Sequence, residues 1–143
     1  MYTDLAPADS VLQFFVSRRD NQIIGLELLA IALGMSTFEE LLLGRRVCIW
    51  SDNVGSERGV HKGAAKAWDH SQIIHGIWIH AVRLQAHLHI LRVPTEDNIA
   101  DLPSRCEYDL LERIGAPWYT PKLANHYCAK ECWRVLSLRD VLK

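Results

Sequence analysis

No apolar run in the sequence approaches the roughly 20 residues that a membrane-spanning helix needs. The first ten residues are mostly polar or small and have no continuous apolar stretch of the kind that marks a secretory signal. Cysteine is scarce as well, with four residues whose spacing is not that of a small disulfide framework. These absences argue against a membrane protein and against a disulfide scaffold. We expect an intracellular protein, in either the cytoplasm or the nucleus.

Neither sign of charge dominates the chain. The 16 Lys and Arg residues nearly balance the 17 Asp and Glu residues, and the net charge is -1. Binding to nucleic acid would therefore require a local basic patch and not a general excess of positive charge. The candidates for such a patch, which are equally compatible with scattered solvated charges, are Arg18, Arg19, Arg45, Arg46, Arg58, Lys62 and Lys66.

The sequence does have enough apolar material for a folded domain with its own core. The composition is 49% hydrophobic and 23% charged, as in ordinary globular proteins. Strand and helix patterns alternate along residues 1–115, which predicts an α/β layered domain, and residues 116–143 are expected to form a helical tail. The expected strands are 11–16, 47–51 and 88–93, and the expected helices are 23–37, 64–86, 104–115 and 124–136, with a helical or loop segment at 53–63.

Three carboxylates lie next to apolar segments that are expected to form the core, where a charged group needs a partner. Glu27 is the one charge in the apolar run of residues 23–33, Asp52 directly follows a strand pattern, and Asp101 opens a short helical segment. Such groups are costly to bury unless they are paired, hydrogen-bonded or bound to a metal. Functional groups of α/β sheets gather at the carboxyl ends of the strands. We therefore expect the three carboxylates to converge and to bind Mg²⁺ or Mn²⁺.

Each carboxylate also has a plainer explanation. Glu27 is explained equally well as a residue near a helix start or as the partner of a nearby arginine. Asp52 is in a position to cap the segment that follows it. Asp101 has Arg105 four residues later, which is the spacing of a salt bridge within a helix.

Three segments, in this order, resemble the ribonuclease H-like region of retrotransposon reverse transcriptases. Residues 20–31 (DNQIIGLELLAI) are similar to the third strand and first helix of that family. Ser51-Asp52-Asn53 is similar to the family's (S/T)D(N/S) motif, and residues 92–105 (RVPTEDNIADLPSR) resemble its N-x-x-A-D-x-L-(A/S)-R ending. The resemblance covers residues 11–115 and depends on the order and spacing of all three segments.

The resemblance implies a ribonuclease H-like mixed five-stranded sheet flanked by helices. It also implies cleavage of the RNA strand of an RNA–DNA hybrid with two Mg²⁺ ions. Glu27, Asp52 and Asp101 match three of the family's four carboxylates and are the expected catalytic residues and metal ligands. The residues expected to contact nucleic acid are Asn21, Gln22, Asn53 and Arg105.

The chain departs from the family at its beginning. The family's first strand, which carries its first catalytic Asp, and its second strand are not present in full, so the expected domain is N-terminally incomplete. Tyr2-Thr3-Asp4 is similar to the first-strand motif, which makes Asp4 the candidate for the missing ligand. The absent strands would leave a sheet edge unpaired, and we expect a homodimer to cover it.

Two other functions are compatible with the same residues. One is a catalytically inactive domain that acts in nucleic-acid binding or protein assembly. The other is a DNA-processing nuclease or an integrase-like enzyme, which would use the same carboxylate chemistry. A stability that depends on Mg²⁺ would separate the enzymes from the inactive domain, and the choice of substrate would separate the two enzymes.

Overall fold

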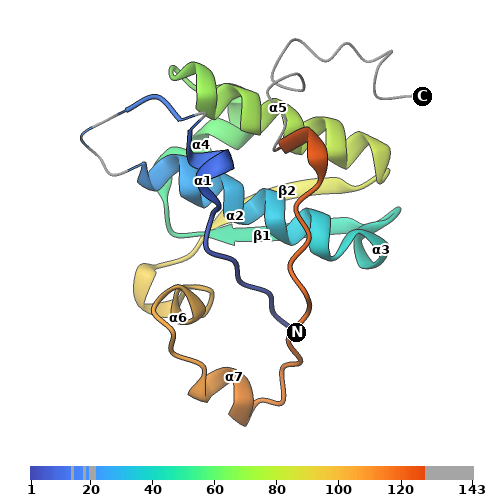
Figure 1. The fold of residues 1–143 in the computed structure, drawn as a ribbon. Coiled ribbons are helices and arrows are strands. Elements are labelled where there is room, and N and C mark those ends of the chain that lie inside the picture. The colour runs from blue at the N-terminus through green and yellow to red at the C-terminus, as the bar shows by residue number, and fades with distance from the viewer. Residues whose placement is uncertain (14, 18, 20–21, 128–143) are drawn as a thin grey trace.

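The computed structural model describes residues 1–13, 15–17, 19 and 22–127, and these residues form a mixed α/β fold with a two-stranded parallel sheet (Figure 1). The strands are β1 (Arg46–Ser51) and β2 (His87–Arg92). The helices are α1 (Asp9–Leu12), α2 (Ile23–Thr37), α3 (Glu39–Leu42), α4 (Val54–Lys62), α5 (Trp68–Arg83), α6 (Asp101–Ser104) and α7 (Asp109–Arg113), with 3-10 turns η1 (Thr95–Asp97) and η2 (Asn125–Tyr127).

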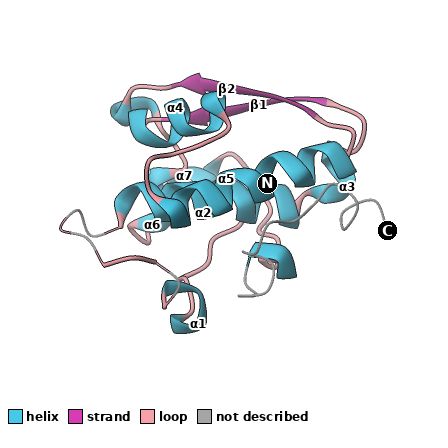
Figure 2. Cartoon of the chain, turned by 90° about the horizontal axis from the view of Figure 1, so that it is seen from above, coloured by secondary structure: helices cyan, strands magenta, loops and turns pink. Residues whose placement is uncertain are grey.

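The two strands run parallel, in a register that pairs Arg46 with His87 at one end and Ser51 with Arg92 at the other. Parallel neighbours need a long crossover connection, and here it consists of α4 and α5. Figure 2 shows that α2, α4 and α5 lie on one side of the strands. The carboxyl end of β1 leads directly into the start of α4.

The core lies between the strands and the helices α2 and α5. Burying each large apolar side chain stabilises the fold by about 1.5–3 kcal/mol relative to leaving it exposed. The buried apolar side chains of this layer are Leu28, Leu29, Ala32 and Met35 of α2, Val60 of α4, Ile73, Ile74, Ile77 and Ala81 of α5, and Leu88 and Ile90 of β2.

The predicted strand at residues 11–16 is wrong. Residues 9–12 form α1, in which Val11 is the buried side chain. Among the described residues no strand lies beside this segment, so an extended chain would leave its backbone groups unpaired. Local bonds satisfy them instead, such as those from the amides of Val11 and Leu12 to the Ala8 carbonyl, at 2.8 and 3.1 Å.

The other principal elements follow the sequence. The helix predicted at residues 23–37 is confirmed as α2 with the same bounds. The strands predicted at 47–51 and 88–93 are confirmed within one residue at each end. The segment at 53–63 is helical, as α4, and the helix predicted at 64–86 is present as the shorter α5.

The helix predicted from Ser104 begins later than expected. Ser104 ends α6, and its hydroxyl donates to the Asp101 carbonyl at 2.7 Å instead of capping a new helix. Cys106 has a φ of 59°, a left-handed conformation that interrupts the helix before α7 begins at Asp109. Gly115, with a φ of 65°, is confirmed as the residue that follows the helix end.

Of the mixed five-stranded sheet expected from the resemblance, the described residues show two parallel strands. The tail helix predicted at 124–136 lies largely outside the described residues, and η2 is the part that is described. Residues 117–119 are tied to the N-terminal segment, because Tyr2 donates to the Pro117 carbonyl at 2.9 Å and accepts from the Tyr119 amide at 2.8 Å. Within the described part of the chain, no helix has the length and apolar character to cross a bilayer.

Candidate functional site

Glu27 lies in the second turn of α2, close to the start of α4. The two helices are in tight contact, since a Cβ placed on Gly55 of α4 would be 2.7 Å from Cδ1 of Ile24. Ile24 and Glu27 are three residues apart and therefore share a face of α2. The half-buried side chain of Glu27 thus lies toward the turn that leads from β1 into α4.

Asp52 lies in that turn, which is fixed by hydrogen bonds from the residues around it. The side chain of Asn53 accepts hydrogen bonds from the amides of Gly55 at 2.8 Å and Ser56 at 3.1 Å, and so caps α4. The buried hydroxyl of Ser51 is 3.1 Å from that of Ser56. The plainer explanation of Asp52 as the cap is therefore wrong, because Asn53 has that role.

Asp101 is the first residue of α6 and is partly buried. Its Oδ2 lies 2.8 Å from Nη2 of Arg105, so the salt bridge expected from the four-residue spacing is confirmed. The Arg105 side chain is 62% exposed, and a solvent-facing pair of this kind contributes only about 0–1 kcal/mol to stability. Another cation can therefore replace Arg105 at little cost.

The three carboxylates are close enough for their charges to interact. Burial raises the pKa of Glu27, and the negative charges of Asp52 and Asp101 raise it further. Side chains from α2, from the turn after β1 and from the start of α6 are thus brought within electrostatic reach of one another. Like charges gathered beside a core disfavour the ionised state of Glu27 unless a cation neutralises them.

In the present arrangement, the described residues contain no group of three or more His, Cys, Asp or Glu side chains that could hold a metal ion. The donor chemistry still fits, because all three groups are carboxylates, the ligands that hard divalent cations prefer. The charge repulsion at Glu27 is also what a bound cation relieves. Closing such a site requires side-chain movement, including the exchange of Arg105 for the cation at Asp101.

Asp4 has partners of its own. Its carboxylate oxygens accept hydrogen bonds from the Tyr108 hydroxyl at 3.0 Å and from the Trp118 indole N–H at 2.9 Å. It is not among the charges that raise the pKa of Glu27. The structure therefore brings Glu27, Asp52 and Asp101 toward one another but does not bring Asp4 to them.

The residues expected to contact nucleic acid have partners within the chain. Gln22 precedes α2 with a φ of 65°, and its side-chain amide donates to the Val16 carbonyl at 2.6 Å. Asn53 caps α4 and Arg105 binds Asp101. Asn21 lies outside the described residues. A nucleic acid would have to compete with these internal contacts.

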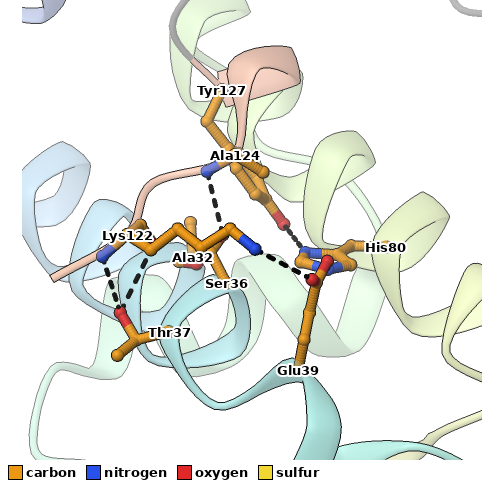
Figure 3. Close-up of polar contacts among 8 residues, drawn as sticks. All are labelled: Ala32, Ser36, Thr37, Glu39, His80, Lys122, Ala124 and Tyr127. Atoms are coloured by element: carbon orange, nitrogen blue, oxygen red, sulfur yellow. Dashed lines mark hydrogen bonds and ion pairs between the residues drawn. The ribbon is translucent and has the colours of Figure 1, made fainter. Parts of the chain in front are cut away.

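The sequence pattern missed a second polar site, which lies beneath residues 122–127 (Figure 3). His80 of α5 is fully buried between Glu39 and Tyr127. His70, also on α5, is buried as well. A signal was available for His80, because it follows Ile73 and Ile77 on the apolar stripe of α5, where a histidine needs a buried partner.

Comparisons with known proteins do not add a relative from which function can be taken. None of the protein-family models matches this chain, and no curated protein or solved structure matches it either. Function must therefore be inferred from the residues described above.

Proposed function

We propose that this chain is a ribonuclease H-like domain of a retroelement, which hydrolyses the RNA strand of RNA–DNA hybrids. Its three motifs follow the order of that family and contain Glu27, Asp52 and Asp101. The observation that carries the proposal is the raised pKa of Glu27, to which the charges of Asp52 and Asp101 contribute after burial.

In this proposal Glu27, Asp52 and Asp101 hold Mg²⁺ or Mn²⁺. Two such ions supply an activated water and stabilise the leaving oxygen of a phosphodiester. The chain contributes a fixed frame, because the Asn53 cap sets the turn at Asp52 and the close packing of α4 on α2 positions it beside Glu27. Arg105, once displaced from Asp101, would have its guanidinium free to bind a phosphate of the substrate.

The test is a cleavage assay on a labelled RNA–DNA hybrid with Mn²⁺ or Mg²⁺. We expect the unmodified protein to cut the RNA strand and Asp52→Asn to lose this activity. Glu112→Gln, which removes an exposed acid of α7, is the matched control and should cut normally. Equal cleavage by the unmodified protein and Asp52→Asn would contradict the proposal. Cleavage of duplex DNA, with the hybrid left intact, would identify a DNA-processing enzyme instead.

A second candidate function, an inactive assembly module, is favoured by the sheet. Within the described residues β1 and β2 pair only with each other, so each has an unpaired edge. Two-stranded sheets are marginal by themselves, and open edges recruit further strands. Trp50, on the face of β1 turned away from the core, is 58% exposed. In this alternative a second copy of the chain covers the open sheet as a homodimer.

Mass measurement in solution and melting with and without Mg²⁺ separate the two functions. The metal-binding enzyme gains thermal stability with Mg²⁺, and Asp52→Asn loses that gain. The assembly module is a dimer whose melting is indifferent to Mg²⁺. Trp50→Lys, which places a charge on the exposed strand face, should convert such a dimer to monomers.

A further inference from the structure

Residues 122–127 cross α2 and α5 and are held there by a group of polar side chains, named here the His80 cluster: Glu39, His80, Lys122, His126 and Tyr127. Figure 3 shows Glu39, His80, Lys122 and Tyr127. His80 and Tyr127 are 0% and 1% exposed, respectively. Lys122 reaches Glu39 from the solvent side, with Nζ 3.6 Å from Oε2. The cluster thus connects α3, α5 and the 122–127 segment around a buried imidazole.

A neutral His80 satisfies both polar contacts at the centre of the cluster. The Nε2–H of His80 donates to Oε1 of Glu39 at 2.7 Å, and the Tyr127 hydroxyl donates to Nδ1 at 3.3 Å. The tautomer follows from these partners, because Glu39 offers only acceptors. A proton added at Nδ1 reverses the hydrogen bond with Tyr127, whose hydroxyl can also accept, and places a positive charge on an imidazole that the docked segment buries.

The surroundings of His80 disfavour that proton. Burial lowers the pKa of His80, and the positive charges of Arg83 and Lys122 lower it as well, although Glu39 acts in the opposite direction. The result is that Glu39 and His80 form a hydrogen bond at neutral pH, with the charge on the carboxylate. Burial also tends to raise the pKa of Glu39, but its contacts with His80 and Lys122 outweigh this and lower it.

His126 strengthens the same effect. Its ring centroid lies 5.1 Å from that of His80, and its Nε2 is buried with no hydrogen-bond partner in the described part of the chain. Burial, followed by the charges of His80 and Arg83, lowers the pKa of His126 to about 4. If both imidazoles were protonated, their positive charges would be repelled by those of Arg83 and Lys122, and the carboxylate of Glu39 would offset this repulsion in part.

Two further hydrogen bonds of the segment use hydroxyl groups, which do not titrate in this range. The amide of Lys122 donates to Oγ1 of Thr37 at 3.0 Å, and the amide of Ala124 donates to Oγ of Ser36 at 3.2 Å. Both bonds join the segment to the end of α2. The two amides are therefore reporters of docking that do not themselves belong to the titrating groups.

We propose that the His80 cluster is a proton-operated latch, which holds residues 122–127 on α2, α3 and α5 at neutral pH and releases them in mild acid. Release requires His80 and His126 to bind protons that the docked segment excludes. The equilibrium between docked and released segment should therefore shift by about tenfold per pH unit through His126 between pH 6.5 and about 4, with a further contribution of the same sign from His80. The latch is independent of the proposed nuclease function, because it uses none of the same residues.

Hydrogen exchange of the ¹⁵N-labelled full chain, measured by NMR from pH 7.5 to 4.5, tests the latch. We expect the protection factors of the Lys122 and Ala124 amides to fall with acid, with a slope above one proton. Amides in the middle of α2 should keep their protection over the same range. Unchanged protection at Lys122 and Ala124, or a simultaneous loss across α2, would overturn the proposal.

Variants identify the titrating groups. His126→Phe keeps an aromatic ring and removes one proton-binding site, so the slope should fall by about one proton. The control is His75→Gln, which lies at an exposed position of α5, the helix that carries His80, and it should behave as the unmodified protein. Tyr127→Phe keeps the buried ring and removes the hydroxyl, and should weaken protection at every pH. An unchanged slope in His126→Phe, or a changed slope in His75→Gln, would contradict the latch.

Discussion

Gly76 of α5 lies directly against the ring of Tyr127, since a Cβ placed on Gly76 would be 2.8 Å from Cε1 and 3.2 Å from Cδ1 of that ring. Real Cβ atoms do not approach a neighbour so closely, and the ring is buried, so it has little room to turn away. The absence of a side chain at Gly76 is therefore what allows Tyr127 to reach His80.

Gly76→Ala should destabilise the protein. The clash with Tyr127 should cost about 1–3 kcal/mol, offset in part by the roughly 0.5–1 kcal/mol that alanine gains over glycine inside a helix. Gly34→Ala is the matched control, because nothing lies within 4 Å of a Cβ placed on Gly34 of α2. It should gain that helix contribution without the clash. Urea unfolding measures both, and a Gly76→Ala variant as stable as Gly34→Ala would contradict this packing.

Asn53→Ala should cost about 0.5–2 kcal/mol in the free energy of unfolding, because the amides of Gly55 and Ser56 lose their acceptor. Asn53→Ser keeps a side-chain oxygen at the cap and should recover most of the loss. The midpoint of urea unfolding should change while its slope stays constant. Equal midpoints for the alanine and serine variants would show that the cap does not stabilise α4.

Glu27→Gln should stabilise the protein at pH 7 when no divalent cation is present. The folded-state pKa of Glu27 is raised above the ordinary value of 4.5, so between these two values the folded protein binds more protons than the unfolded chain. The contribution of Glu27 to stability is therefore fully present below pH 4.5 and is lost as the pH rises through its folded-state pKa. The glutamine variant should not show this loss.

The measurement is the difference in unfolding free energy between Glu27→Gln and the unmodified protein from pH 4 to 7.5. The two proteins must be compared because both also contain His80 and His126, whose lowered pKa values make the protein lose stability as the pH falls below 6.5. This pH dependence is opposite in sign to that of Glu27, and it cancels in the difference. Glu112→Gln should show no such difference. A difference that stays constant with pH would contradict the raised pKa of Glu27.

Arg105→Gln should change stability by no more than about 1 kcal/mol, because its ion pair with Asp101 faces solvent. The same change should raise the affinity for Mg²⁺, since the cation no longer competes with Arg105 for the carboxylate. Thermal melting across a Mg²⁺ titration reports both effects. Arg113→Gln, at an exposed position of α7, is the control. An unchanged Mg²⁺ response in Arg105→Gln would remove Asp101 from the proposed site.

The sequence predicted those elements whose pattern is complete within a short stretch. The apolar run of α2 and the strand patterns of β1 and β2 identified these elements almost to the residue, because burial on most sides leaves a continuous local signal. The three carboxylates were found in the same way, as charges in apolar or strand-adjacent positions. The sequence predicts that the three carboxylates converge on a metal ion, and in the structure burial and the charges of Asp52 and Asp101 raise the pKa of Glu27.

What the sequence by itself determined is thus α2, β1 and β2, the helical crossover between the two strands, and the identity of the acids beside the core. Only the tertiary structure decided that residues 9–12 form a helix and that Asn53 caps α4. It also decided the partners of two polar side chains: Asp4 accepts hydrogen bonds from Tyr108 and Trp118, and His80 lies between Glu39 and Tyr127. The physical reason is that hydrogen-bond partners are fixed by whatever lies nearby in space. A polar side chain carries the same signal in the sequence whether its partner is water, a neighbour or a residue a hundred positions away.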